Sequence, residues 1–242
     1  MATTNQDLTE KMDRMVQEVI EKQNHKYWEA SNELVLWHNA ALSKYNFWKL
    51  LQAYANRFMA ERGCFHPFVV DDGNREIILQ MYLYIIGSKE CKWNINKGIY
   101  MAGKVGCGKT ILMHSFCEIL HFVSGMTVEM IPAPELCDKI ASKGFERYAS
   151  RPLFIDELGR EKYEMNAFGN KIYPIKELIA IRYNKGARTF FTSNFKISTL
   201  SKWRSDNGEI IGYGSDIGDR IREMTTIVEM PGESRRPNQG ER

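Results

Sequence analysis

The sequence has little excess charge, no long hydrophobic run and no paired cysteine motif. Its 33 basic and 30 acidic residues leave a formal net charge of +3, far from the strongly basic character of a protein that binds nucleic acid by charge alone. This balance neither identifies nor excludes a nucleic-acid partner. With 43% hydrophobic and 26% charged residues among 242, the chain is ordinary for a globular protein of one or two domains, which argues against disordered and fibrous classes.

The five cysteines are odd in number and contain no C-x-x-C pair, so neither a disulfide framework nor a thiolate zinc site is indicated. The longest apolar run, residues 77–86, is interrupted by Gln80 and is too short to span a membrane. The first residues carry acids and lack the apolar segment of a secretion signal. We therefore expect a protein of the reducing cytoplasm with no membrane partner.

The region from Asp7 to about Gly63 has helical periodicity and no internal glycine or proline. Apolar residues recur there at three- and four-residue spacing in two stretches: Met12, Met15, Val16, Val19 and Ile20, and then Phe47, Leu50, Leu51, Tyr54 and Phe58. The region also contains Trp28, Trp37 and Trp48, which fit either a buried core or a surface that docks another protein. Turn formers over residues 65–74 predict a domain boundary near residues 63–68, and hence a helical N-terminal region 1–66.

Short apolar runs alternate with helical patterns after this boundary. The runs cover residues 98–102, 126–131, 153–155, 189–191 and 226–230, and helical patterns cover 75–86, from 109, from 134 and 173–185. Alternation of this kind predicts an α/β core, a parallel five-stranded sheet flanked by helices on both faces. We assign the core to residues 67–236 and a polar tail to 237–242.

The segment Gly103–Thr110, GKVGCGKT, matches the phosphate-loop pattern G-x-x-x-x-G-K-[ST] at every fixed position. Glycines let successive backbone N–H groups face phosphate oxygens, and the helix that follows adds the positive end of its dipole. Lys109 would neutralise the β- and γ-phosphates of ATP, and Thr110 would ligate Mg²⁺. The residues expected around the nucleotide are Gly103, Lys104, Val105, Gly106, Cys107, Gly108, Lys109, Thr110 and Ile111.

Two of these loop residues have simpler interpretations. Cys107 lies where a helix N-terminus lowers a thiol pKa, which would suit a redox switch, but a small side chain that merely fits the loop is the favoured interpretation. Lys104 fits a solvated charge better than a second phosphate ligand.

Two further strands end in polar side chains. The run Arg151–Glu157, RPLFIDE, ends in Asp156 and Glu157, a pattern that places carboxylates at the sheet edge beside the phosphate loop. Asp156 would hold Mg²⁺ and Glu157 would polarise the attacking water, so that binding becomes hydrolysis; an acidic helix cap is the alternative. Asn194 ends the run 188–194, where it either orients the water or is an ordinary turn residue.

The segment Tyr213–Met224 predicts a helix that presents Arg220. An arginine offered to the γ-phosphate of a neighbouring subunit accelerates phosphoryl transfer by roughly 10³–10⁵ in known systems. A surface salt bridge explains the same spacing equally well.

Taken together, GKVGCGKT, LFIDELG, FFTSN, YGSDIGDRIREM and GESRR resemble the successive motifs of AAA+ ATPases of the DnaC/IstB type, over about residues 68–236. The resemblance implies that Asn194 is the sensor 1 residue and that Arg220, or Arg222 beside it, is the arginine finger. It also places Asn74 near the adenine and Arg236, or its neighbour Arg235, on the phosphates as a sensor 2 equivalent.

The chain departs from the family in two respects. Asp156-Glu157 stands where close relatives often carry two aspartates, which raises the expectation of real turnover. The sequence also ends soon after GESRR, so no full C-terminal lid domain is expected.

The resemblance implies an Mg²⁺-dependent ATPase of a bacterial or phage-infected cell that acts as a helicase loader. It would grip a hexameric replicative DNA helicase through its N-terminal helices, bind single-stranded DNA and self-associate on ATP into an arc, spiral or ring. Lys139, Lys143 and Arg147 are candidates for the DNA contact, or a solvated helix face. The alternatives are an IstB-like transposition helper that binds DNA and a transposase, a small-molecule P-loop kinase, and a nucleotide-gated module with negligible turnover.

Overall fold

The computed structural model describes residues 11–25, 41–167, 169–205 and 207–235. Trp28, Trp37 and Arg236, for which the sequence suggests roles, lie outside these ranges, as does the tail 237–242. Residues 11–25 form a helix whose side chains are all exposed. In the described ranges, no helix combines the length and apolar character that crossing a bilayer requires.

Five strands form one parallel sheet in the order β2-β3-β6-β1-β7. They are β1 (Gly98–Gly103), β2 (Glu129–Pro132), β3 (Leu153–Leu158), β6 (Thr189–Ser193) and β7 (Thr225–Met230). The predicted five-stranded parallel sheet is therefore confirmed. The edge strand β2 starts three residues later than expected from the apolar run 126–131, because its ladder begins where Glu129 meets Leu153, the first residue of β3.

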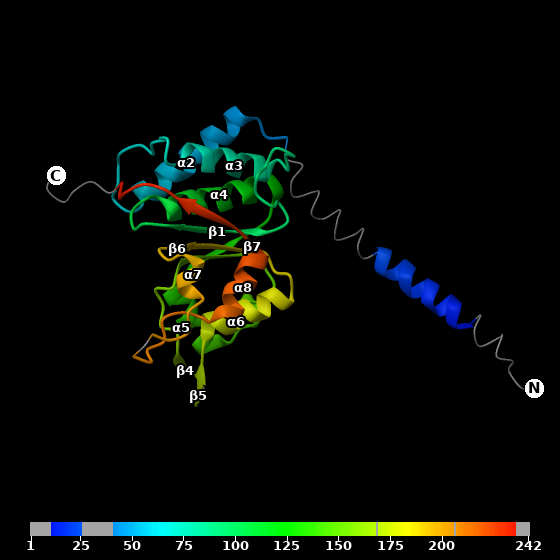
Figure 1. The fold of residues 1–242 in the computed structure, drawn as a ribbon. Helices are drawn as coiled ribbons and strands as arrows, with labels where there is room; N and C mark the ends of the chain where they lie inside the picture. The colour runs from blue at the N-terminus through cyan, green and yellow to red at the C-terminus, as the bar shows by residue number, and fades with distance from the viewer. Residues whose placement is uncertain (1–10, 26–40, 168, 206, 236–242) are drawn as a thin grey trace, which may run out of the picture.

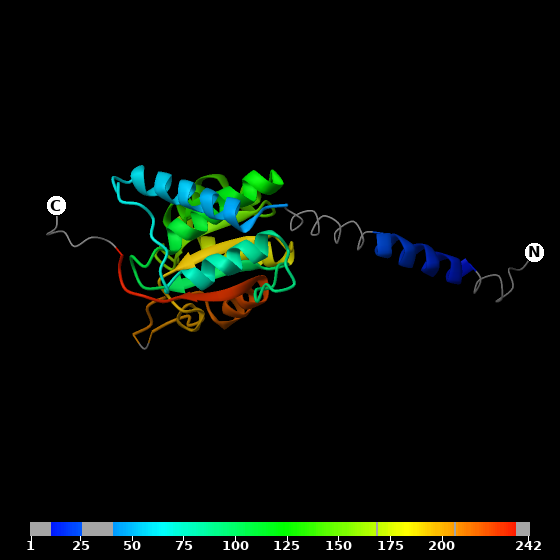
Figure 2. The same ribbon diagram turned by 90° about the horizontal axis from the view of Figure 1, so that it is seen from above.

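Helices cover both faces of the sheet, as Figure 1 shows. One face carries α2 (Lys44–Ala60), α3 (Arg75–Ile85) and α4 (Lys109–Ser124), and the other carries α5 (Ala133–Lys143), α6 (Pro174–Asn184), α7 (Ile197–Leu200) and α8 (Ser215–Met224). Viewed from above, α3 (teal) runs along the direction of β7 (red) in Figure 2. Alternate residues of β1 serve the two layers, since Ile99 and Met101 belong to one apolar cluster and Tyr100 and Ala102 to the other.

Helix α2 lies in the segment that the sequence assigns to the N-terminal region, and it packs into the core. Its buried side chains are Phe47, Leu51, Ala55, Phe58 and Met59. It lies against α4, where Arg57 pairs with Glu118 at 3.2 Å and the Phe58 ring packs in a tilted arrangement on His114, with 4.5 Å between the centroids. Trp48 packs against the same apolar cluster, in agreement with the core interpretation of this tryptophan.

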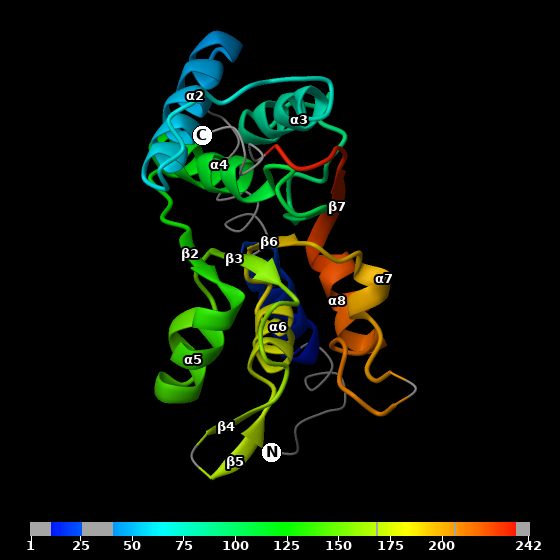
Figure 3. The same cartoon turned by 90° about the vertical axis from the view of Figure 1, so that its left-hand side faces the viewer.

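A two-stranded antiparallel hairpin, β4 (Met165–Ala167) and β5 (Asn170–Ile172), stands between β3 and α6. It extends away from the sheet beyond α5 and α6, as Figures 1 and 3 show. The sequence pattern predicts no strand here, because three-residue strands carry too few side chains for a period of two to stand out.

A fully buried arginine ties together the end of the sheet at which β3 and β6 begin. Arg182 of α6 has no exposed surface, and its Nε donates to Thr189 Oγ1 at 2.9 Å. Its two Nη groups donate to the carbonyl oxygens of Tyr148, Arg151 (3.0 Å) and Arg188 (2.6 Å). Burial lowers the pKa of Arg182 to about 10. Among the residues that the structure describes, the Thr189 hydroxyl and three carbonyl oxygens hold the cation.

Replacing Arg182 with methionine should lower the free energy of unfolding by roughly 3 kcal/mol, because buried carbonyl oxygens lose their donors. Denaturant titration measures the change. The control is Arg147→Met, which removes an arginine that is mostly exposed and pairs with Glu129 at 3.0 Å, and which should cost less than about 1 kcal/mol. Equal losses in the two variants would contradict the role given to Arg182.

Candidate nucleotide-binding and catalytic site

The phosphate loop connects β1 to α4 through two glycines in left-handed backbone conformations. Gly106 has φ of 81° and Gly108 has φ of 104°, a region that side-chain-bearing residues rarely adopt. A Cβ atom on Gly106 would also lie 2.3 Å from the hydroxyl oxygen of Ser234. Cys107 between them is completely buried, which fits a small side chain that fills the loop interior.

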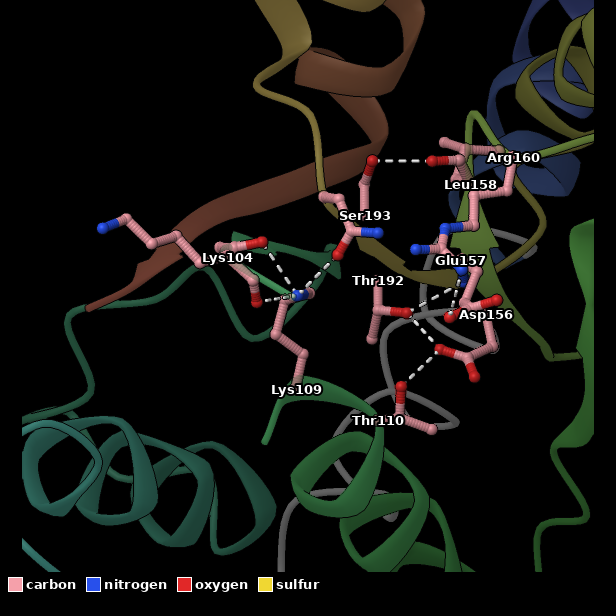
Figure 4. Close-up of polar contacts among 11 residues, drawn as sticks. Lys104, Lys109, Thr110, Asp156, Glu157, Leu158, Arg160, Thr192 and Ser193 are labelled. Atoms are coloured by element: carbon pink, nitrogen blue, oxygen red, sulfur yellow. Dashed lines mark hydrogen bonds and ion pairs between the residues drawn. The ribbon is translucent and has the colours of Figure 1, made fainter. Parts of the chain in front are cut away.

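Lys109, the first residue of α4, lies inside this loop (Figure 4). Its ammonium group donates to the carbonyl oxygens of Gly103 and Lys104, each at 2.8 Å, and to Asn194 Oδ1 at 3.0 Å. Burial lowers the pKa of Lys109, and the neighbouring groups of Cys107, Asp156 and Glu157 oppose this shift. The loop therefore holds a partly desolvated cation beside the end of β6.

The acidic end of β3 meets the start of α4 as Figure 4 shows. The Thr110 hydroxyl donates to Asp156 Oδ1 at 2.9 Å, and the Thr192 hydroxyl donates to the same oxygen. A hydroxyl and a carboxylate with oxygen atoms this close match the ligands that Mg²⁺ takes from proteins, which usually supply one or two groups beside phosphate and water. The residues present thus fit a magnesium site.

Glu157 has a left-handed backbone conformation. Its φ of 57° makes it the one non-glycine residue with positive φ in the described part of the chain. The Glu157 N–H donates to Thr192 Oγ1 at 3.1 Å, and its carboxylate lies 3.5 Å from Arg160. The turn directs Glu157 into the same cavity as Lys109 and Thr110.

A cavity of about 760 Å³ extends from the phosphate loop to the end of α2. Lys109, Thr110, Glu157 and Asn194 line its polar end. Its other end is formed by the last turn of α2 and the segment 64–71, which contribute mainly Phe58, Met59, Cys64, Pro67, Phe68 and Val69. The cavity therefore combines polar groups that suit phosphates with an apolar compartment that suits a nucleobase.

The segment after β7 closes over the phosphate loop. The Arg235 N–H donates to the Gly106 carbonyl at 3.0 Å, and Arg235 Nη2 pairs with Asp71 at 2.7 Å. Arg235 Nη1 is buried and has no hydrogen-bond partner among the described residues, and Arg235 lines the cavity. Of the two arginines proposed as the sensor 2 equivalent, Arg235 therefore lies at the cavity, whereas Arg236 falls outside the described residues.

Asn74, expected near the adenine, does not line the cavity. It is fully buried, and its amide accepts the Asp71 N–H and donates to the Val69 carbonyl, each at 3.0 Å. Both of those residues do line the cavity. Asn74 thus shapes the loop that carries them.

The arginines of α8 lie outside the cavity of their own chain. The Arg220 guanidinium lies over the Tyr183 ring at 5.3 Å, and Arg222 pairs with Asp219 at 2.7 Å. The candidate DNA contacts are also paired in part, since Lys139 bonds to Glu135 at 2.7 Å and Arg147 to Glu129. These ion pairs reduce the net positive charge on the surface of α5 and of the short helix Glu146–Tyr148 that follows it.

Several site residues escaped the sequence analysis. Thr192 and Ser193 of β6 bond to the Asp156–Leu158 segment, although only Asn194 was singled out from this strand end. Asp71 and Arg160 were missed as well. A polar run at the end of a buried strand, Thr-Ser-Asn, is the pattern that points to the β6 pair.

The phosphate loop between β1 and α4, with the polar ends of β3 and β6 beside it, defines a P-loop fold built on a parallel α/β sheet. No protein-family model matches the sequence, and no curated protein matches it. The solved structure of DnaI is similar to this chain, with 22% identity over 70% of this chain and 87% of that chain and a TM-score of 0.51.

A candidate primosome component from Streptococcus pyogenes serotype M3 has 17% identity over 70% of this chain and 85% of that chain, with a TM-score of 0.51. The structure of the DnaC helicase loader has 18% identity over 68% of this chain and 93% of that chain, with a TM-score of 0.49. The likeness to DnaI and the streptococcal protein is one of fold, and it agrees with the AAA+ core predicted from the motifs.

Nucleotide should protect Cys64 from alkylation. Cys64 and Cys91 are half-buried, whereas the other three cysteines are buried, and of the first two only Cys64 lines the cavity. A maleimide pulse followed by peptide mass spectrometry should show the Cys64 rate falling several-fold with ATP. Cys91, whose pKa is raised by burial, is the internal control and should keep its rate; equal protection of both would argue against this cavity as the binding site.

Proposed function

We propose that this chain is an Mg²⁺-dependent ATPase that acts in DNA replication as a helicase loader. The observation that carries the ATPase activity is the convergence of Lys109, Thr110 and Glu157 at one end of a single cavity, with Asp156 hydrogen-bonded to Thr110 beside it. Phosphate-binding, metal-binding and water-activating groups are the components that phosphoryl transfer to water requires.

Each residue has a role that follows from its position. Lys109 and the loop N–H groups bind the β- and γ-phosphates, and Thr110 and Asp156 present oxygen ligands for Mg²⁺. Glu157 accepts the proton of the attacking water, and Asn194, which bonds to Lys109 at 3.0 Å, orients that water. Arg235 contacts the phosphates from the segment that lies over the loop.

The arginine finger comes from a neighbouring copy in this proposal. Arg220 and Arg222 do not line the cavity of their own chain. Both lie on α8, which covers the face of the sheet opposite α4. A site that is completed by α8 of the next subunit makes hydrolysis depend on self-association into an arc, spiral or ring.

The loader role rests on the motif resemblance to DnaC/IstB ATPases, on the fold shared with a candidate primosome component, and on the N-terminal helix. Helix 11–25 exposes Met12, Met15, Val16, Val19 and Ile20 by 46–59% each, a stripe at helical spacing that suits an apolar groove on a partner. We propose a hexameric replicative helicase as that partner and single-stranded DNA as the ligand of the assembled core.

Glu157→Gln should strongly slow steady-state hydrolysis while ATP still binds, because the amide keeps the shape of the side chain and cannot act as the base. The rate constant should fall by about 10²–10³-fold. A phosphate-release assay and equilibrium nucleotide binding measure both.

The specific activity of the wild-type protein should rise with protein concentration, and Arg220→Ala should remove that rise. The same phosphate-release assay measures the rise; constant specific activity would contradict a finger in trans.

The protein should co-elute with the replicative helicase of its own genome in size-exclusion chromatography. Val19→Asp, which places a charge in the exposed apolar stripe of helix 11–25, should weaken the complex by at least tenfold, or about 1.4 kcal/mol. The control is Glu18→Gln on the same exposed helix, which should have little effect. Failure to bind the helicase would remove the loader role and leave the ATPase activity in place.

A further inference from the structure

Glu161 is a buried carboxylate four residues after Glu157 in the chain. Its residue surface is 6% exposed, and both of its oxygen atoms have donors. Oε2 accepts the Gly159 N–H at 2.9 Å, and Oε1 accepts the hydroxyl of Tyr213, which is itself 1% exposed. The side chain therefore links the turn after β3 to the residue that precedes Gly214 and helix α8.

Burial of this carboxylate is costly for the fold. Burial raises the pKa of Glu161, and the hydrogen bonds from Tyr213 and from backbone N–H groups oppose the shift only in part. Among the residues that the structure describes, no lysine or arginine pairs with it. Because a well-packed apolar residue commonly serves stability as well as a buried ionisable group, its hydrogen bonds indicate a role other than stability.

One hydrogen bond of Glu161 falls on the segment 157–159, which comprises the last two residues of β3 and the start of the turn after it, and which carries the proposed base. Side chains hold this segment at three points in succession: Thr192 Oγ1 accepts the Glu157 N–H at 3.1 Å, Ser193 Oγ donates to the Leu158 carbonyl at 2.6 Å, and Glu161 accepts the Gly159 N–H. The first two anchors come from β6, and Glu161 supplies the third. The segment needs such anchors, since φ of 57° at Glu157 is an unfavourable conformation for a residue with a side chain.

Tyr213 is fixed by contacts that do not involve its hydroxyl. Its N–H donates to the Leu200 carbonyl at 2.7 Å, and its ring packs edge-on against Tyr163 with 5.2 Å between the centroids. The hydroxyl thus reaches Glu161 from a rigid support. Removal of the hydroxyl should release Glu161 and the turn while the start of α8 stays in place.

We propose that Glu161 and Tyr213 are positioning residues for Glu157. Together they hold the end of β3 and the turn after it in the conformation that aims the carboxylate of Glu157 into the nucleotide cavity. This inference rests on the proposed ATPase function. It assigns no contact with nucleotide to either residue, since neither lines the cavity.

The first test compares Tyr213→Phe with Glu161→Gln. The phenylalanine variant should lower kcat by about tenfold with KM nearly unchanged, because the base is misplaced while the nucleotide site is intact. Glu161→Gln can still accept the Gly159 N–H and bond to Tyr213, so it should stay within about twofold of the wild-type kcat. The matched control is Tyr82→Phe on α3, which removes a hydroxyl bond to the Leu42 carbonyl (3.2 Å) far from the turn. An unchanged kcat in Tyr213→Phe would overturn the proposal.

A mixing experiment separates positioning of the base from an effect through α8. Glu157→Gln subunits keep the finger and Arg220→Ala subunits keep the base, so a mixture of the two should regain hydrolysis. Tyr213→Phe added to the Arg220→Ala subunit should lower this regained activity, and added to the Glu157→Gln subunit it should not. Loss only in the second arrangement, or equal loss in both, would place the effect in α8 or in general stability and overturn the proposal.

A measurement that does not depend on hydrolysis distinguishes the positioning role of Tyr213 from the proposed ATPase function. Hydrogen exchange of the full-length protein should be faster at the peptide containing Gly159 in Tyr213→Phe than in the wild type and in Tyr82→Phe, with β6 unchanged. If the wild-type protein hydrolyses no ATP, the proposed function fails while this measurement still decides whether Tyr213 holds the turn. Unchanged exchange at Gly159 would overturn the inference whatever the ATPase activity.

Discussion

Parallel pairing of the three central strands is the constraint from which the site follows. Ala102 of β1 and Leu158 of β3 both pair with Ser193 of β6, so the carboxyl ends of these strands meet at one edge of the sheet. The phosphate loop, the acidic pair and the polar end of β6 are adjacent for this reason. A one-residue shift in either register would turn the side chains at these strand ends to the opposite face and separate the groups that hold Thr110, Asp156 and Thr192 together.

The parts of the site that were predictable from sequence are those whose chemistry is local. A phosphate loop needs glycines and a helix start within eight residues, and an acidic strand end needs one apolar run, so Lys109, Thr110, Asp156 and Glu157 were identified by their pattern. The Arg235–Asp71 and Tyr213–Glu161 contacts join residues 164 and 52 positions apart. No period or spacing encodes such pairs. Asn74 illustrates the converse, because a polar residue type suggested ligand contact where the side chain is used by its own loop.

The same limit applies to the fold. Helical periodicity identified the segment that contains α2, and alternation identified the sheet, but the partner of an apolar helix face is set by tertiary packing. Helix α2 lies on α4, and its last turn contributes Phe58 and Met59 to the cavity. The described helix that follows helix 11–25 in the sequence therefore contributes one wall of the proposed nucleotide site.

The buried guanidinium of Arg182 means that the two ends of the sheet are held together in different ways. At the edge where β3 and β6 begin, one planar cation cross-links a helix, a strand and two connecting segments. At the opposite end of the sheet, β1 leads into the phosphate loop, β3 ends just after Glu157, and β7 leads into the segment that contains Arg235. One side chain therefore holds the end of the sheet where β3 and β6 begin, whereas separate hydrogen bonds of Thr110, Thr192 and Ser193 hold the end that faces the cavity.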